Sequence, residues 1–293
     1  MTTSEIENIE ISLLLEAIFQ RYGHDFRQYT RGSISRRIEH FLVDSGHARI
    51  SEMIPRLLWD EAFFERLVSL FSVTVTEMFR DPLTYRSLRE EVFPLLRTYP
   101  FIRIWHAGCA TGEEAYSLAI ALKEEGLYEK ATIFATDFND AALSIAKEGI
   151  YPLDNIKQFT KNYQEAGGTA SFSDYYQAQY DHVAVSQPLK QNITFANHNL
   201  TTDGVFGEMH LIMCRNVLIY LDKTLQERVL KLFNDSLIHG GFMCLGSAES
   251  LDFTDVQGDY KVISETCKIY QKKSFAGRPS GMHMIRQEHV PSE

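Results

Sequence analysis

The chain has 293 residues, of which 44% are hydrophobic and 23% charged, a composition that excludes extended disorder and suits one large or two modest globular domains. Its formal charge of −10, from 29 basic and 39 acidic residues, argues against general nucleic-acid binding. The four cysteines form no C-x-x-C pair and no apolar run approaches ~18 residues, so we expect neither disulfides, nor a metal site, nor membrane insertion.

Residues 1 to about 82 are expected to form an all-helical domain. The start is acidic, with no basic residue before Arg21, which is the wrong sign for a signal peptide and favours a cytoplasmic protein. Apolar residues recur at helical spacing in three stripes that can pack on one another as a small bundle. The stripes are Leu14, Leu15, Ile18, Phe19 and Tyr22; Ile34, Ile38, Phe41 and Leu42; and Phe64, Leu67, Val68 and Phe71.

The second of these predicted helices carries a basic outer face. Between residues 20 and 50 the chain has six arginines and three acids, against the acidic balance of the whole. Arg36 and Arg37 lie with Ser33 and His40 on the side away from the apolar stripe. Such a face is either simply solvated or docks an acidic partner, and the pattern alone leaves both interpretations open.

The segment SVTVTEMFRDP, residues 72–82, is expected to be an extended link between two domains. Two valines alternate in it with Thr74 and Thr76, so the two threonines point the same way. Arg80 follows them, and a helix is expected over residues 85–97. Because ligand pockets favour domain junctions, the polar residues of this link are candidate ligand contacts.

The stretch from residue 101 to residue 137 organises the rest of the chain. A buried strand at 102–107, a turn between two glycines, a helix from Glu113 and a second strand ending on Asp137 follow one another. This is the order of a nucleotide-type site in a parallel α/β sheet, in which the final acid binds the hydroxyls of a ribose. The plainer interpretation is an ordinary βαβ crossover whose helix begins with two acids.

The identity of the nucleotide follows from what the turn lacks. The chain has neither the G-x-G-x-x-G dinucleotide fingerprint nor a P-loop. Glu113 and Glu114 stand where a pyrophosphate would dock, and their charges would repel it. An acidic helix start suits a ligand with a ribose and positive charge but without phosphates, and S-adenosylmethionine is such a ligand.

The second half of the chain completes the expected sheet. We expect a helix capped by Asn139, an irregular stretch at 151–173, and a small inserted antiparallel β sub-domain at about 174–198. A buried strand at 209–214 is followed by Arg215 and Asn216 at its carboxyl end. A helix with its apolar stripe over 225–237 and a last, antiparallel strand at 268–272 precede a loose tail. The expected domains are therefore 1–82, 83–275 and a tail at 276–293.

Three segments together resemble the CheR family of chemotaxis-receptor glutamate methyltransferases. They are SVTVTEMFRDP, AGCATGEEAYSLAI followed by ATDFN, and MCRNVLIYLDKTLQERVL, and the resemblance covers roughly residues 10–272. It implies a Rossmann-like S-adenosylmethionine methyltransferase sheet with an N-terminal all-helical domain and a small inserted antiparallel β sub-domain. Some family members carry Asn where Thr74 stands, which puts one cofactor hydrogen bond in doubt.

The resemblance also implies a role for each matched residue. Arg80 and Tyr220 would lie beside the reacting methyl group. The basic face with Arg36 and Arg37 would steer the glutamate-rich cytoplasmic helices of a chemoreceptor, and in some members the small sub-domain grips a receptor peptide. The implied cofactor-binding residues are Thr74, Thr76, Arg80, Glu114, Asp137, Asn199, Leu200, Arg215 and Asn216.

The implied reaction needs no metal and no general base, because a glutamate carboxylate, with a pKa of ~4.3, is already ionised near neutral pH. We expect a monomer that binds neither nucleic acid nor membrane. Two alternatives stay open: a CheR-like adaptor without turnover, and a nucleic-acid methyltransferase on the same α/β core. The second is opposed by the net charge, by the absence of an N-P-P-Y-type motif, and by Met213 in front of Cys214, where a Pro-Cys nucleophile would need proline.

Overall fold

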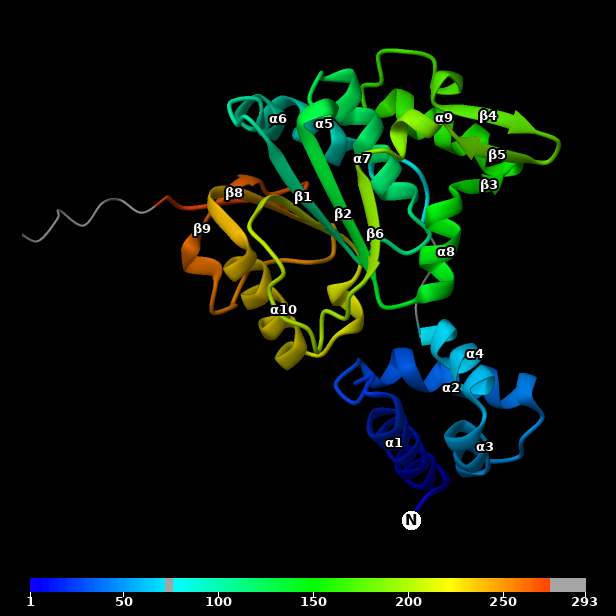
Figure 1. Ribbon diagram of the computed structural model, residues 1–293. Coiled ribbons are helices and arrows are strands. Elements are labelled where there is room, and N and C mark those ends of the chain that lie inside the picture. The colour runs from blue at the N-terminus through cyan, green and yellow to red at the C-terminus, as the bar shows by residue number, and fades with distance from the viewer. Residues whose placement is uncertain (72–75, 275–293) are drawn as a thin grey trace, which may run out of the picture.

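The computed structural model describes residues 1–71 and 76–274, which form a helical domain followed by an α/β domain (Figure 1). The N-terminal helices are α1 (Thr3–Tyr22), α2 (Arg31–Ser45), α3 (Met53–Trp59) and α4 (Glu61–Phe71). Their apolar stripes meet in a core of their own, in which Leu14, Ile38 and Leu67 are fully buried, so the predicted bundle is confirmed. Within the described residues, no helix combines the length and apolarity needed to cross a membrane.

The α/β domain is built on a seven-stranded sheet with the order β6-β2-β1-β7-β8-β10-β9. The first five strands in this order run parallel, and β10 is antiparallel to both of its neighbours. The strands are β1 (Ile102–Ala107), β2 (Ala131–Asp137), β6 (Ile193–Asn197), β7 (Met209–Cys214), β8 (Leu237–Leu245), β9 (Tyr260–Ser264) and β10 (Ile269–Lys272). The sheet thus has the predicted parallel core and antiparallel last strand, while β9 is an addition.

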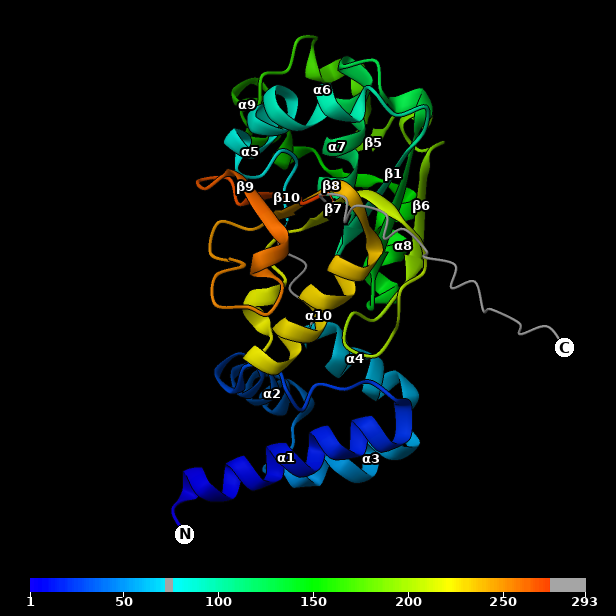
Figure 2. The same cartoon turned by 90° about the vertical axis from the view of Figure 1, so that its left-hand side faces the viewer.

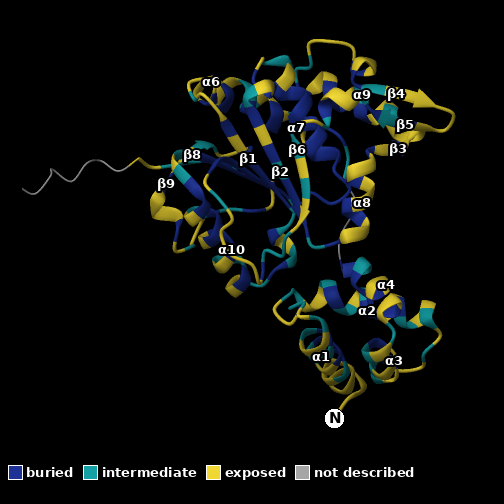
Figure 3. Ribbon diagram, in the orientation of Figure 1, coloured by how far each residue is buried: buried dark blue, intermediate teal, exposed yellow. Residues whose placement is uncertain are grey.

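Side chains alternate between the two faces of this sheet, and each face has its own core. On β1, Ile102 and Ile104 join the core beneath α7 (Glu113–Glu124), whereas Trp105 and Ala107 join the core beneath α10 (Lys223–Ser236). In Figure 3 the carboxyl-terminal parts of β1 and β2 are dark blue, whereas the edge strand β6 is teal and yellow and exposed residues lie on the outer faces of the helices. β1 is buried on both faces from Ile104 onward, which is why apolar residues fall on both sides of this strand.

The N-terminal helices lie beyond the carboxyl ends of the parallel strands. The arrowheads of β1, β2 and β6 point toward α2 and α4 in Figure 1, and Figure 2 shows the same helices below the sheet after a quarter turn. Backbone hydrogen bonds join the two parts, since Thr30 N donates to Tyr220 O over 2.9 Å and Asp222 N donates to Gln28 O over 2.9 Å. The edge of the sheet that binds ligands in parallel α/β folds is therefore covered.

The inserted small sheet exists, but its composition differs from the prediction. Its three strands, in the order β3-β5-β4, are β3 (Ile150–Pro152), β4 (Tyr176–Gln179) and β5 (His182–Val185). The expected boundary near residue 198 is wrong, because β6 pairs in parallel with β2 and belongs to the main sheet. Short strands of similar composition do not reveal which sheet they join, and that choice depends on pairing partners far away in sequence.

Helices also form where the sequence suggested irregular chain or a single helix. Residues 151–173 include α9 (Ile156–Glu165), whose Phe159 and Tyr163 are buried in the domain core. The helix expected at 85–97 is a succession of α5 (Pro82–Ser87), a π-helical turn (Leu88–Val92) and α6 (Phe93–Leu96). The helix capped by Asn139 is confirmed as α8 (Asp140–Glu148).

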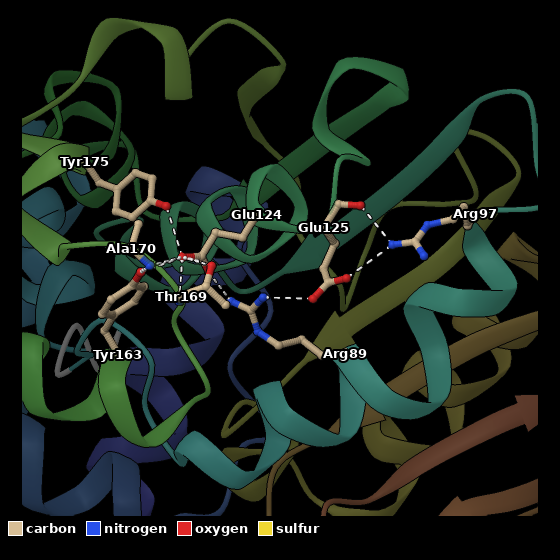
Figure 4. A network of polar contacts seen from close by, with 8 residues as sticks. All are labelled: Arg89, Arg97, Glu124, Glu125, Tyr163, Thr169, Ala170 and Tyr175. Atoms are coloured by element: carbon tan, nitrogen blue, oxygen red, sulfur yellow. Dashed lines mark hydrogen bonds and ion pairs between the residues drawn. The ribbon is translucent and has the colours of Figure 1, made fainter.

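A buried carboxylate fastens α9 and the segment that leads from it to β4 to the helix that begins the site (Figure 4). Glu124 ends α7, and its side chain is 3% exposed. Its Oε1 accepts hydrogen bonds from Thr169 N over 3.0 Å and from Tyr175 Oη over 3.1 Å, as well as from Tyr163 Oη, while Arg89 pairs with Oε2. Burial raises the pKa of Glu124, but the hydrogen bonds from Tyr163 and Thr169 and the charge of Arg89 outweigh it and lower that pKa.

We expect Glu124→Gln to lower the free energy of unfolding by about 2 kcal/mol, because the substitution removes the more buried of the two carboxylates that pair with Arg89 and weakens the hydrogen bonds that end on it. Since the native pKa of Glu124 is lowered, its contribution is present above the unfolded pKa near ~4.3 and is lost as the pH falls through the native value. Urea unfolding at pH 7 measures the loss. The matched control is Glu125→Gln, whose carboxylate is more exposed and should cost less than about 1 kcal/mol. Equal losses for the two variants would contradict the assignment.

Candidate functional site

A pocket lies at the carboxyl ends of the parallel strands, where the N-terminal helices cover the sheet. The space between its walls, counted out to the open mouth, is about 890 Å³. Its walls come from the N-terminal domain, the link before α5, and the chain segments that follow four neighbouring strands. The lining residues are Tyr29, Phe71, Thr76, Arg80, His106, Gly108, Cys109, Ala110, Glu114, Asp137, Phe138, His198, Asn199, Leu200, Thr201, Arg215, Asn216, Val217, Tyr220 and Leu221.

The turn after β1 forms the floor of the pocket with bare backbone. Gly108 has φ +75°, and a Cβ there would lie 2.5 Å from Cγ2 of Val217. Gly112 has φ +91°, and a Cβ there would lie 2.8 Å from that of Ala146 on α8. Both positions therefore require glycine, for conformation and for space. The chain can thereby turn sharply from β1 into α7, and the first residues of α7 face the pocket.

Asp137 ends β2 and is held in place by backbone donors. Its Oδ2 accepts from Ala110 N over 2.9 Å, and its Oδ1 accepts from Asn139 N over 3.0 Å. Burial raises the pKa of this carboxyl group, and the backbone hydrogen bonds oppose that rise. A rigid acid at the tip of the second strand is well suited to accept hydrogen bonds from the two hydroxyls of a ribose.

Arg215, directly after β7, places its buried guanidinium between two acids from other segments, the buried Glu114 and the partly exposed Asp81. Its Nη1 lies 2.9 Å from Oε1 of Glu114 at the start of α7, and its Nη2 lies 2.6 Å from Oδ2 of Asp81 in the link. Nη1 also donates to the carbonyl oxygen of Arg80 over 3.2 Å. Burial alone would raise the pKa of Glu114, but the charge of Arg215 and the neighbouring His106 lower it to about 2. Glu114 is therefore an anion at the pocket wall at any physiological pH.

Glu249 holds the segment after Arg215 by accepting a row of backbone N–H groups. Its Oε1 accepts from Val217 N over 2.9 Å and Leu218 N over 2.7 Å, and its Oε2 accepts from Asn216 N over 3.1 Å and Gly246 N over 2.6 Å. Burial raises the pKa of Glu249, and these hydrogen bonds oppose the rise. This carboxylate fixes the wall that carries Asn216 and, a few residues on, Tyr220.

The N-terminal domain contributes Tyr29 to the pocket lining, and Arg37 supports a lining residue from outside it. Tyr29 lines the pocket and forms an isolated antiparallel bridge with Leu221. Burial raises the pKa of Tyr29, and the carboxylate of Asp137 adds to the rise. The guanidinium of Arg37 lies 5.2 Å from the ring centroid of Tyr220, and its Nη1 donates to the carbonyl oxygen of Phe71. The structure therefore corrects the expected outer position of Arg37, because this half-buried side chain supports Tyr220, whereas Arg36 is exposed.

The structure brings most of the predicted site residues together. The residues that line the pocket are Thr76, Arg80, Glu114, Asp137, Asn199, Leu200, Arg215, Asn216 and Tyr220. Thr74 lies outside the described residues, and Arg36 and Arg37 are not part of the lining. The sequence analysis did not identify Tyr29, His106, Asp81 or Glu249 as site residues. Two of them could have been found from the sequence: Asp81 directly follows Arg80, and His106 lies two residues before the first glycine of the turn.

The chemistry of the pocket lining suits S-adenosylmethionine. Neither ring nitrogen of the buried His106 hydrogen-bonds to another described residue, and Oδ1 of Asn216 is likewise without a partner among them. Polar groups of this kind require a polar ligand or water beside them. Apolar lining from Phe138 and Leu200 and ionised lining from Glu114 and Arg215 suit a ligand with an aromatic base and a charged tail.

Comparison with known proteins agrees with this geometry. Residues 74–269 match the family described as CheR methyltransferase, SAM binding domain, and residues 9–72 match CheR methyltransferase, all-alpha domain. Cher3 of Pseudomonas putida, named as a methyltransferase, is 46% identical over 93% of this chain and 100% of its own length. The chemotaxis protein methyltransferase of Listeria monocytogenes is 28% identical over 78% of this chain and 85% of its own, and that of Borreliella burgdorferi is 28% identical over 83% and 88%. The chain therefore belongs to the CheR methyltransferase family and has an S-adenosylmethionine-binding domain.

Proposed function

We propose that this chain transfers the methyl group of S-adenosylmethionine to glutamate side-chain carboxylates on the cytoplasmic helices of chemoreceptors. The observation that carries the proposal is the position of the pocket. It lies between the domain that binds S-adenosylmethionine and a separate helical domain, which has a basic helix. The names of the Listeria and Borreliella relatives, which are chemotaxis protein methyltransferases, support the same assignment.

The binding roles proposed for the lining follow the order of the strands. From β6 through β2 and β1 to β7 the strand ends span about 14 Å, at roughly 4.8 Å for each neighbouring pair. In this arrangement Asn199 and Leu200 beside β6 receive the adenine, Asp137 on β2 the ribose, and Glu114 and Arg215 beside β7 the amino-acid tail. The charged tail is placed at the charged end because the other end offers Leu200 and aromatic side chains.

The chemistry asks the protein for alignment rather than for proton transfer. When bound, S-adenosylmethionine supplies an electrophilic methyl group on a positively charged sulfur. The incoming glutamate is ionised near neutral pH because its pKa is ~4.3, so it attacks without a general base. Exact positioning of two reactants can supply on the order of 7 to 11 kcal/mol at best, and the rigid walls held by Arg215 and Glu249 suit that task.

Arg80 and Tyr220 are the residues proposed to act on the incoming carboxylate. Both line the pocket, and Tyr220 is braced by Arg37 from the N-terminal domain. A guanidinium can hold a carboxylate as a fork, and a phenol can donate one further hydrogen bond. Arg80 and Tyr220 must not bind the carboxylate too tightly, because stabilising this anion more than the transition state would slow its attack on the methyl group.

We expect the purified chain, incubated with the tritiated methyl donor and receptor-containing membranes, to label protein with a mark that mild base releases. A carboxyl methyl ester hydrolyses in base, whereas N-methyl groups do not. Heat-inactivated chain is the control. Label in added nucleic acid would favour a nucleic-acid methyltransferase, and absence of label from every fraction would favour a receptor- or cofactor-binding adaptor.

Asp137→Asn should weaken binding of S-adenosylhomocysteine by about 10- to 100-fold, because hydrogen bonds from the ribose to a charged acceptor contribute about 1.5 to 3 kcal/mol. Isothermal titration calorimetry measures the dissociation constant. Asp140→Asn is the matched control, since this neighbouring acid belongs to the first turn of α8 and is not part of the pocket lining. If Asp137→Asn binds S-adenosylhomocysteine with unchanged affinity, the proposed position of the ribose beside Asp137 is wrong.

Arg36→Glu should lower the rate of receptor methylation at limiting receptor by about fivefold and leave the affinity for S-adenosylhomocysteine unchanged, because a charge outside the pocket acts on encounter with an acidic partner. Arg49→Glu serves as the matched control, since this arginine is also exposed in the N-terminal domain but lies beyond the end of α2. If both reversals slow methylation equally, a general loss of positive charge explains the effect and the docking role of Arg36 fails.

A further inference from the structure

His106 is a buried, polar residue of the pocket that none of the roles above uses. It is the penultimate residue of β1, is 2% exposed, and lines the pocket. Its partners in the sheet, Ala135 on β2 and Met213 on β7, occupy the same level of neighbouring strands. The side chain therefore stands at the centre of the sheet edge, between the strand end that bears Asp137 and the one that leads to Arg215.

The surroundings of His106 leave its hydrogen-bonding capacity unused. Neither Nδ1 nor Nε2 hydrogen-bonds to another residue in the described ranges 1–71 and 76–274. Nε2 lies 3.7 Å from Oε1 of Glu114, too far for a hydrogen bond, and that oxygen already accepts from Nη1 of Arg215 over 2.9 Å. Burying an imidazole without a hydrogen-bond partner costs free energy, so its place at a pocket wall points to a ligand group that supplies that partner.

We propose that His106 and Glu114 together bind the ammonium group of the methyl donor's amino-acid tail. An ammonium has three donors and no acceptor, and an imidazole nitrogen that carries no proton can accept one of them beside the Glu114 carboxylate. The donor's carboxylate would be repelled by Glu114, whereas the ammonium is attracted to it. His106 is in this role a recognition residue that distinguishes a nucleoside with an intact amino-acid tail from one without it.

The inference rests on the cofactor placement proposed above, in which the tail lies between the ends of β1 and β7. It extends that placement, because it assigns one chemical group of the ligand to one residue. It also predicts a pattern of affinities that a merely structural histidine would not produce. A packing role would alter the binding of every ligand by a similar factor or would alter none.

The test compares three ligands by isothermal titration calorimetry: S-adenosylhomocysteine, its analogue that lacks only the amino group, and 5′-methylthioadenosine, which lacks the whole tail. For His106→Leu we expect binding of S-adenosylhomocysteine to weaken about tenfold or more, the effect of one hydrogen bond to a charged group. Binding of the other two ligands should stay within about twofold of the parent chain. His106→Ala, with its thermal unfolding recorded, provides a second variant in case leucine disturbs the packing.

The matched control is His198→Leu, since His198 also lines the pocket but packs edge-to-face against Trp105 near the proposed adenine end. Its substitution should change the affinities for all three ligands by the same factor. The inference is overturned if His106→Leu weakens the three ligands equally, or if it weakens the deaminated analogue as much as S-adenosylhomocysteine. A parent chain that binds none of the ligands overturns the cofactor placement as well, whereas tail-selective binding without receptor methylation would refute only the proposed substrate.

Discussion

The pocket depends above all on the buried guanidinium of Arg215. One side chain joins the segment after β7 to the start of α7 through Glu114 and to the link before α5 through Asp81. A buried charge is tolerated only where opposite charges and hydrogen bonds replace its lost hydration, so each partner needs the others. The three walls of the pocket therefore keep a fixed relation to one another, and the acid at the start of α7 remains ionised.

Glu249 is a second buried charge that fixes a wall of the pocket. Backbone N–H groups of the segment after Arg215 stabilise it, in place of a cation. Its carboxylate accepts from consecutive N–H groups at residues 216–218, and a Cβ at Gly246 would come within 2.7 Å of Asn216 N. The site wall is thus set by satisfied charge and close backbone approach more than by apolar packing. Such a shell holds binding groups rigidly before any ligand arrives, which is what a reaction governed by alignment requires.

The parts of the fold and site that could be predicted from the sequence are those determined by local pattern. The strand, glycine turn and helix around Asp137 follow from periodicity and turn chemistry over a few residues, and so do the N-terminal helices. The sheet to which β6 belongs, the inward turn of Arg37 and the role of Glu249 depend instead on partners distant in sequence. His106 was overlooked because a lone histidine inside an apolar strand is ordinarily a packing residue.

The bridge between Tyr29 and Leu221 limits when the pocket can form during translation. The N-terminal helices make mainly local contacts and can fold while the ribosome is still translating the sheet. The bridge that holds these helices over the strand ends cannot form until the residues around Leu221 have left the exit tunnel. The nascent chain therefore completes its ligand pocket late in synthesis, because the pocket needs residues from both ends of the chain.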